Sequence, residues 1–336
     1  MSWLARLHVG LLSLPLLLGS LALADGDFEC QQQDRPADPP PFNPPRIFDP
    51  SGNPVIPDGP VFTDPLCPPG TVPVSTLGDP YAVKGHPTIT GDSLAQLGPD
   101  DDCDGVVYNG TCFYYGDARY YRQADGGGMT LTIERPVYVT SGLGGHSIAE
   151  ISVQGGPGYK NIIEVGWNVS LEQYGDTDPH LFVYHWINGN ETCYDKCNFV
   201  PVSKTYFPKM NLSGLIGHHS YSGWVYWLGN WWAWFDNQWL GYYPGTEWGQ
   251  EYRQNGLTQW FGEVATKNGI PPQTQMGNGL FPSDPSAAVM ETLCDVNSTD
   301  WVCWYRDLQT LNATVPSYYD IQRTGFGATR YGGPGM

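Results

Sequence analysis

Positive charge and long apolar runs are both scarce in this chain. Its 16 lysine and arginine residues stand against 34 acidic ones, which gives a net charge of −18. Because the basic residues form no cluster, nucleic acid and anionic membranes are disfavoured as partners. Beyond the N-terminus no stretch approaches the roughly 18 uninterrupted apolar residues of a membrane span. We therefore expect neither nucleic acid nor a membrane as a partner. We also expect the protein to be a monomer.

Two common hydrolase motifs are also absent from the sequence. There is no G-x-S-x-G, and the nearest string, which contains His146 and Ser147, lacks the pattern. There is no H-E-x-x-H, and the adjacent His218 and His219 would face opposite sides of a strand. These absences disfavour a serine hydrolase and a metalloprotease.

Two metal sites are weighed as alternatives. Cys193 and Cys197 have histidines nearby and could hold zinc, but exported thiols oxidise and no second cysteine pair has finger spacing. The acidic run at residues 100–104 could hold calcium, but it lacks EF-hand spacing and such runs are more often solvated loops. We expect no metal and no cofactor.

The N-terminus has the features of a secretory signal. Arg6 precedes the apolar stretch GLLSLPLLLGSLALA, which ends in the small-x-small triplet A-L-A at residues 22–24. Residues 1–24 are therefore predicted to be a signal peptide, and the mature chain is predicted to be secreted and extracellular. In that oxidising compartment the cysteines are expected to form disulfides. Their local spacing favours the pairs Cys30–Cys67, Cys103–Cys112, Cys193–Cys197 and Cys294–Cys303.

Six N-x-S/T sequons mark segments that are expected to reach solvent and to carry glycans. The excess of acidic residues suits the solubility of an extracellular protein, or acidic surroundings in which many carboxylates are neutral. The sequons begin at Asn109, Asn168, Asn190, Asn211, Asn297 and Asn312.

Proline divides the chain into two parts. Residues 25–75 are dense in proline, lack helical and strand periodicity, and are predicted to be an extended linker or pro-segment. Residues 76–336 contain short β-rich runs bounded by turn residues, which is typical of a single all-β domain. A short turn is expected near residues 285–293. The expected strands include residues 129–133, 147–153, 161–169, 180–187, 223–228, 231–235, 238–242 and 259–265.

Alternation within two of these strands predicts the direction of two glutamates. In NIIEVGWNV, Val165 and Trp167 share the core face and Glu164 points away from it. In QWFGEVA, Phe261 and Glu263 share one face, and apolar residues on both faces indicate a central strand. Glutamate is depleted in strands and costly to bury unless it is paired or protonated, so both are candidates for chemistry. The alternative is that each forms a partly exposed salt bridge.

Five blocks of the sequence, in order, resemble the neprosin peptidase domain. The first, NIIEVGWNVSLEQYGDTDPHLFVYHWINGNETCYDKCNF, covers residues 161–199 and contains an E-x-G-W-x-V core and a Cys-Tyr…Cys clip. The resemblance spans roughly residues 145–335 and implies an antiparallel β-sandwich of two sheets, with a cleft on one curved sheet. The other blocks are NWWAWFDNQWLGYYP (230–244), WFGEV (260–264), MGNGLFP (276–282) and YDIQ…YGGPG (319–335).

The resemblance also implies an activity. Members are glutamic endopeptidases that cleave next to proline in acid, with one catalytic glutamate in the E-x-G-W block and one in the W-G-G-E-V block. These positions fall on Glu164 and Glu263. An ionised carboxylate would take a proton from the attacking water, and a protonated one would donate to the carbonyl oxygen and the leaving nitrogen. Activity is therefore expected in acid and is expected to fade towards neutral pH.

Aromatic side chains near the glutamates are the predicted substrate contacts. The flat, apolar ring of proline stacks well on tryptophan or tyrosine. Tyr184 and Trp186 alternate with inward-facing residues and so share the other face of their strand, and Trp260 of the WFGEV block is predicted with them. The expected partners are proline-containing peptides or proteins.

Two residues depart from the family pattern. Phe261 stands where the family usually has glycine, and its ring, two positions before Glu263, would narrow the cleft or alter specificity. Glu150 stands where members often carry glutamine. A third carboxylate near the pair would shift its titration, unless it is simply solvated.

Two other functions stay open. Aromatic-rich β-proteins also bind sugars, and glycosidases use two carboxylates, so a carbohydrate-active or carbohydrate-binding sandwich is the leading alternative. A catalytically silent extracellular protein with the same fold is the other. In that case Glu164 and Glu263 would lie too far apart to share a water molecule.

Overall fold

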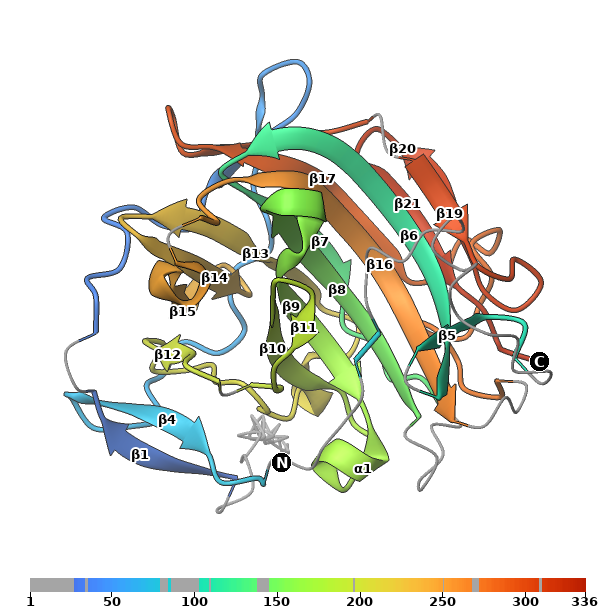
Figure 1. Cartoon of the computed structure of the whole chain (residues 1–336), viewed down its shortest axis with the longest axis horizontal. Helices are drawn as coiled ribbons and strands as arrows, with labels where there is room; N and C mark the ends of the chain where they lie inside the picture. The colour runs from blue at the N-terminus through green and yellow to red at the C-terminus, as the bar shows by residue number, and fades with distance from the viewer. Residues whose placement is uncertain are drawn as a thin grey trace, which may run out of the picture.

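The chain, seen as a computed structural model, is built almost entirely of β-strands (Figure 1). It confirms the predicted all-β class, with two large sheets in a sandwich-like arrangement. The signal peptide, most of the acidic run and Asn109 lie outside the residues that the structure describes. The described residues are 27–33, 36–78, 84–85, 103–108, 110–137, 145–195, 197–249, 251–267, 272–307 and 310–336.

The first large sheet carries both predicted catalytic glutamates, and its strand pairs are antiparallel. β16 lies between β8 and β6, as predicted for a central strand. Figure 1 shows that β6 and β16 curve strongly along their length. In order across the sheet, the described strands are β11 (Asn190–Glu191), β10 (His180–Ile187), β9 (Asn161–Val169), β8 (His146–Gly155), β16 (Asn255–Lys267), β6 (Thr111–Ala124) and β19 (Thr310–Ala313), with β5 (Val106–Tyr108) also paired to β6.

The second large sheet packs against the first. Its pairs are antiparallel except for β2 with β18, which is parallel. Its described strands, in order, are β12 (Val200–Pro201), β15 (Gln238–Pro244), β14 (Asn230–Phe235), β13 (His219–Trp227), β7 (Gly126–Thr132), β17 (Val289–Asn297), β18 (Val302–Tyr305), β2 (Arg46–Phe48) and β3 (Pro54–Val55), with β21 (Ala328–Gly332) joining β17 to β20 (Asp320–Gly325).

The remaining elements are small. β1 (Phe28–Gln32) and β4 (Thr71–Ser75) pair as a separate two-stranded sheet. No helix in the described part of the chain is long and apolar enough to cross a membrane. The helical pieces are α1 (Leu171–Tyr174) and 3-10 turns at Pro157–Tyr159, Ser213–Leu215 and Gly245–Trp248.

Alternating side chains from both sheets fill the core between them. Val165 and Trp167 of β9 and Leu181 of β10 pack there without exposed surface, together with Trp224 of β13. Ile162 of β9 lies in a separate cluster on the other face of the first sheet. The alternation predicted for β9 and β10 is therefore confirmed, and it turns the face that carries Glu164 away from the core.

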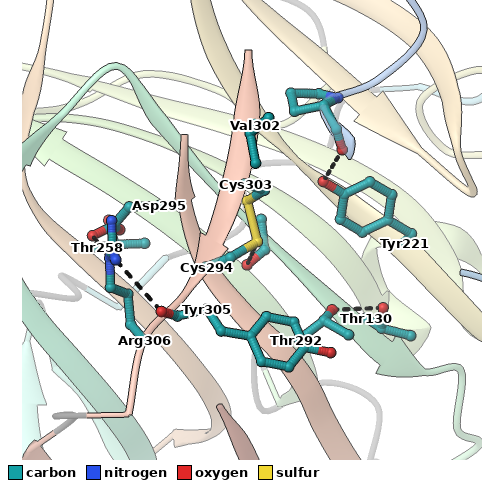
Figure 2. Close-up of a disulfide and its surroundings, with 12 residues drawn as sticks. Thr130, Tyr221, Thr258, Thr292, Cys294, Asp295, Val302, Cys303, Tyr305 and Arg306 are labelled. Carbon is teal, nitrogen blue, oxygen red and sulfur yellow. Dashed lines mark hydrogen bonds and ion pairs between the residues drawn. A yellow bond between two sulfur atoms is a disulfide. The ribbon is translucent and has the colours of Figure 1, made fainter. Parts of the chain in front are cut away.

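All four predicted disulfides are present: Cys30–Cys67, Cys103–Cys112, Cys193–Cys197 and Cys294–Cys303. Figure 2 shows Cys294–Cys303 joining β17 to β18. Beside it, the buried Asp295 accepts a hydrogen bond from Thr258 and pairs with Arg306 at 3.1 Å. The Cys193–Cys197 bond leaves no thiolate for the alternative zinc site.

The proline-rich segment, predicted to be an extended linker or pro-segment, packs against the rest of the fold. It contributes β1, β2, β3 and β4, and its residues 37–55 lie on the outer aromatic face of the second sheet. The ring of Phe42 stacks on Trp301 at 4.9 Å, and the Trp239 indole donates to the Phe42 carbonyl at 2.9 Å. The hydroxyl of Tyr221, labelled in Figure 2, donates to the Pro45 carbonyl at 2.7 Å. Partners on the sheet, rather than a periodicity of its own, order this segment.

Two further expectations are met only in part. The short turn expected near residues 285–293 covers residues 285–287, whereas β17 begins at Val289, and polar residues and a bulge between Glu291 and Cys294 disguise that strand. The sequon residue Asn168 has no exposed surface and donates to Gln173 at 3.0 Å, so it does not reach solvent. By contrast, Asn190, Asn297 and Asn312 are exposed, and Asn211 is half-buried.

The core can be tested with two leucines. Leu181→Ala removes a side chain with no exposure and should lower the free energy of unfolding by about 2–5 kcal/mol, because a cavity adds to the lost burial. Leu228→Ala makes the same change at a side chain that is 80% exposed, and should alter the free energy of unfolding by less than about 0.5 kcal/mol. Chemical denaturation of both variants checks this. Equal losses would contradict the burial assigned to Leu181.

Candidate active site

Glutamates from three neighbouring strands meet the ammonium group of one lysine. Glu164 lies on β9, Glu150 on β8 and Glu263 on β16, all on the face of the first sheet that points away from the core. Lys84 Nζ lies 2.5 Å from Glu150 Oε1, 3.1 Å from Glu263 Oε2 and 3.8 Å from Glu164 Oε2. All four side chains are fully buried. The fold thus brings Glu164 and Glu263 to one nitrogen atom.

The strand register places Glu150 between the other two glutamates. Across β8 and β9, Ser152 is paired with Glu164, and across β8 and β16, Ile148 is paired with Glu263. Glu150 lies midway between Ile148 and Ser152 on the central strand of the three. Because residues two apart share a face, the three carboxylates form a diagonal line across the sheet with Glu150 at its centre.

Two glycines allow this close approach. A Cβ on Gly166, the glycine of the E-x-G-W block, would lie 2.0 Å from the Ala149 carbonyl oxygen and 2.8 Å from Glu150 Cβ. A Cβ on Gly85 would lie 2.6 Å from Glu263 Oε2. Glycine is therefore needed both beside Glu150 and directly after Lys84.

The environments of Glu164 and Glu263 drive their pKa values apart. Burial opposes ionisation of Glu263, but the Lys84 ammonium and the hydrogen bond with His146 outweigh it and lower the pKa to about 2. His146 Nε2 lies 2.6 Å from Glu263 Oε1. Burial raises the pKa of Glu164 to about 7, although Lys84 acts against this rise. One carboxyl group is therefore set up to be ionised and the other to hold a proton.

The remaining two charged groups are also perturbed. Burial raises the pKa of Glu150 well above its ordinary value, and the charge of Glu164 adds to the rise while Lys84 opposes it. Burial would lower the pKa of Lys84, but the three surrounding glutamates outweigh it and raise that pKa. Lys84 is therefore held in its charged form by the carboxylates.

Aromatic rings cover the same face beside the glutamates. Tyr184 is paired with Glu164 across β10 and β9, and its ring lies 5.6 Å from that of Trp186. The ring of Tyr194, in the loop closed by the Cys193–Cys197 disulfide, lies 4.8 Å from Tyr184. Tyr184 and Trp186 thus lie on the glutamate face, as the alternation predicted, but both are buried in this arrangement.

The prediction of Trp260 as a substrate contact is wrong. Its side chain points into the core between the sheets, where the indole donates to the Gly128 carbonyl at 3.0 Å. Alternation along β16 puts it on the face opposite to Glu263. The neighbouring Phe261 is on the glutamate face instead, paired across strands with Glu150, and its ring centre lies 5.3 Å from Lys84 Nζ.

A sequence model described as Neprosin matches residues 144–334. The chain belongs to the neprosin family. Membership of this family supports a peptidase, and together with the four disulfides it indicates an extracellular protein. The E-x-G-W and WFGEV blocks of the family, with Glu164 and Glu263, both fall inside the matched residues.

Solved structures with some likeness to this neprosin family member include a peptidase and glycosidases. Scytalido-glutamic peptidase with a transition state analog inhibitor is 10% identical, with a TM-score of 0.40 over 66% of this chain and 98% of that one. Bacillus licheniformis beta-glucanase is 10% identical, with a TM-score of 0.27 over 47% and 75% of the two chains. These TM-scores are too low for either likeness to decide an activity.

Sequence reasoning missed two members of this neprosin-family site. His146 alternates with Glu150 along β8 and so shares its face, which the parity of that strand could have revealed. Lys84 lies outside the described strands, and no periodic signal marks it. In the described ranges, no group of three or more potential ligands is arranged to hold a metal ion.

The opposite pKa shifts predict opposite effects of pH on stability. Glu164 has a folded-state pKa of about 7 against an ordinary value of 4.5, so its contribution is present below pH 4.5 and is lost as pH rises to about 7. Glu263 has a pKa of about 2, so its contribution is present above pH 4.5 and is lost as pH falls to about 2. Glu164→Gln should therefore remove the loss of stability between pH 4.5 and about 7. Glu263→Gln should remove the loss between pH 4.5 and about 2.

Chemical denaturation of the parent and of both variants between pH 2 and 8 measures how stability changes above and below pH 4.5. Each variant serves as the control for the other. If both variants flattened the same window, the different environments assigned to these carboxyl groups would be wrong.

Proposed function

We propose that this chain is a secreted glutamic endopeptidase that hydrolyses peptide bonds next to proline in acid. The supporting observation is the convergence of Glu164 and Glu263, which lie within 3.8 Å of the same Lys84 nitrogen although they are far apart in sequence. A water molecule near the position of that nitrogen would lie between the two carboxyl groups, which are 3.1 Å and 3.8 Å from it. Two carboxyl groups around one water are the requirement for acid–base hydrolysis.

The environments suggest which glutamate has which role. His146 stabilises the ionised form of Glu263 and stays beside it when Lys84 leaves, so Glu263 is the general base. Glu164, whose pKa is about 7, is protonated in acid and is the general acid. Glu263 takes a proton as water attacks the carbonyl carbon, Glu164 gives its proton to the leaving nitrogen, and the C–N bond breaks. Proton exchange with solvent then restores both groups.

In the described arrangement, Lys84 closes the site to water and substrate. Its ammonium fills the place proposed for the water, and Gly85 packs directly against Glu263. Lowering the pH below about 7 protonates Glu164 and removes its attraction for Lys84, so acid favours the withdrawal of Lys84. The restraining segment therefore extends beyond the proline-rich residues 25–75 into the residues 76–336 assigned to the peptidase domain.

Proline selection is attributed to the aromatic rings on the glutamate face. Tyr184 and Trp186 lie beside Glu164, and Phe261 flanks Glu263. When Lys84 and Gly85 move out, these rings can line a cleft in which the pyrrolidine ring stacks. Export by the N-terminal signal and the disulfides suit an extracellular substrate.

The catalytic assignment is tested with isosteric variants. Glu164→Gln and Glu263→Gln should each lower the turnover of a proline-containing peptide in acid by about 10²–10⁴-fold, because each removes one proton-transfer group. Glu291→Gln on the second sheet is the matched control and should keep full turnover. Products are mapped by mass spectrometry between pH 3 and 7. Full turnover in both site variants, or release of reducing sugar without peptide cleavage, would refute the proposal.

The role of Lys84 is tested by removing its charge. We expect the parent to show a lag on transfer into acid, and we expect Lys84→Met to cleave the peptide without one, because nothing then holds the water position closed. Lys204→Met, at an exposed lysine, is the matched control and should keep the lag. Progress curves recorded directly after transfer from neutral pH decide this. Identical curves for the parent and Lys84→Met would show that Lys84 does not restrain the site.

A further inference from the structure

Glu150 is a third buried carboxyl group that the two-glutamate mechanism leaves without a role. Its Oε1 atom is the nearest carboxylate contact of Lys84 Nζ, at 2.5 Å. Its Oε2 atom is buried and has no hydrogen-bond partner among the described residues. A polar atom in this state is costly unless another group satisfies it during function.

The position of Glu150 favours the protonated form of its carboxyl group. It lies at the centre of the diagonal line of carboxyl groups, so it has a like charge on each side, from Glu164 and from Glu263. Phe261 opposite it forms an apolar wall, and His146 is bonded to Glu263 rather than to Glu150. The titratable or charged groups that act on Glu150 are Glu164, Glu263, Lys84, Tyr115 and Tyr194.

Departure of Lys84 removes the positive charge that Glu150 contacts most closely. Three ionised carboxylates cannot then remain side by side at low cost in a buried site. The central group, with two negative neighbours and no cation, is the one that neutralises most readily. Its pKa is raised well above the ordinary value even while Lys84 is still present.

We propose that Glu150 works in its protonated form, as the hydrogen-bond donor to the carbonyl oxygen of the scissile peptide. This inference rests on the proposed peptidase function and adds a third group to it. As water attacks, negative charge develops on that oxygen, and the Glu150 hydroxyl stabilises it without giving up its proton. The proton of the water goes to Glu263, and the leaving nitrogen receives the proton of Glu164. Glu150 ends the cycle as it began, so atoms and charges balance.

The proposal has a distinct signature in the pH dependence of kcat/KM. If Glu150 and Glu164 must both be protonated, activity on the alkaline side falls at a limiting rate of about hundredfold per pH unit. Glutamine at position 150 donates from its amide at every pH, so only Glu164 then limits the fall. Glu150→Gln should retain turnover, with a limiting fall of about tenfold per pH unit. Glu150→Leu, which has no donor, should lose about 10²–10³-fold at the acid optimum.

The comparison is best made in the Lys84→Met full-length chain, because Glu150 also holds Lys84 in the closed arrangement. If Lys84→Met does not fold, Glu150→Gln and Glu150→Leu are measured in the chain that keeps Lys84, after pre-incubation in acid. Glu291→Gln in each background is the control, with an unchanged slope. Three results would each overturn the proposal. The first is an equal alkaline slope of kcat/KM in the parent and in Glu150→Gln. The others are an inactive Glu150→Gln and a fully active Glu150→Leu. Failure of the proposed peptidase function would be recognised separately, because the parent would then show no turnover that depends on Glu164.

Discussion

The contact between one ammonium group and three carboxylates dominates the outer face of the first sheet. A buried charge is costly, and this cluster is tolerated because Lys84 and His146 support the ionised Glu263, while burial raises the pKa values of Glu164 and Glu150 and favours their neutral forms. The same contact has two consequences. It keeps the carboxyl groups together, and in the proposed function it also keeps water and substrate away from them. Closure and chemistry would then use the same atoms.

Sheet geometry supplies the rest of the arrangement. Glu164 and Glu263 lie on strands separated by β8, and they approach one atom because the sheet is curved and their side chains face the same side of it. Gly166 lets β9 approach Glu150 closely, and this explains the glycine of the E-x-G-W block. The opposite faces of the same strands fill the core, so the positions of the carboxyl groups are fixed by packing as well as by charge.

The sequence predicted what alternation can reveal and little beyond it. The strands Asn161–Val169 and His180–Ile187, and the direction of Glu164, follow from a period of two. The central place of Glu150 depends on the register of β8 against its neighbours, which long-range pairing sets. Lys84 comes from a segment without periodicity, so only the folded structure could place it at the glutamates. Strand β17 was missed because its polar residues are satisfied by distant partners such as Arg306, which no local pattern shows.

The proline-rich segment is fastened on one outer face of the sandwich, while Lys84, later in the same chain, enters the other. Between these two points the chain is held again, by the Cys30–Cys67 bond, by the pairing of β4 with β1 and by the hydrogen bond from Lys209 Nζ to the Gly78 carbonyl at 2.6 Å. Tethering of this kind raises the effective concentration of the ammonium group at the carboxylates without adding any contact there. In the proposed mechanism, how firmly β4 and Gly78 are held therefore helps to set how often the glutamates are free of Lys84.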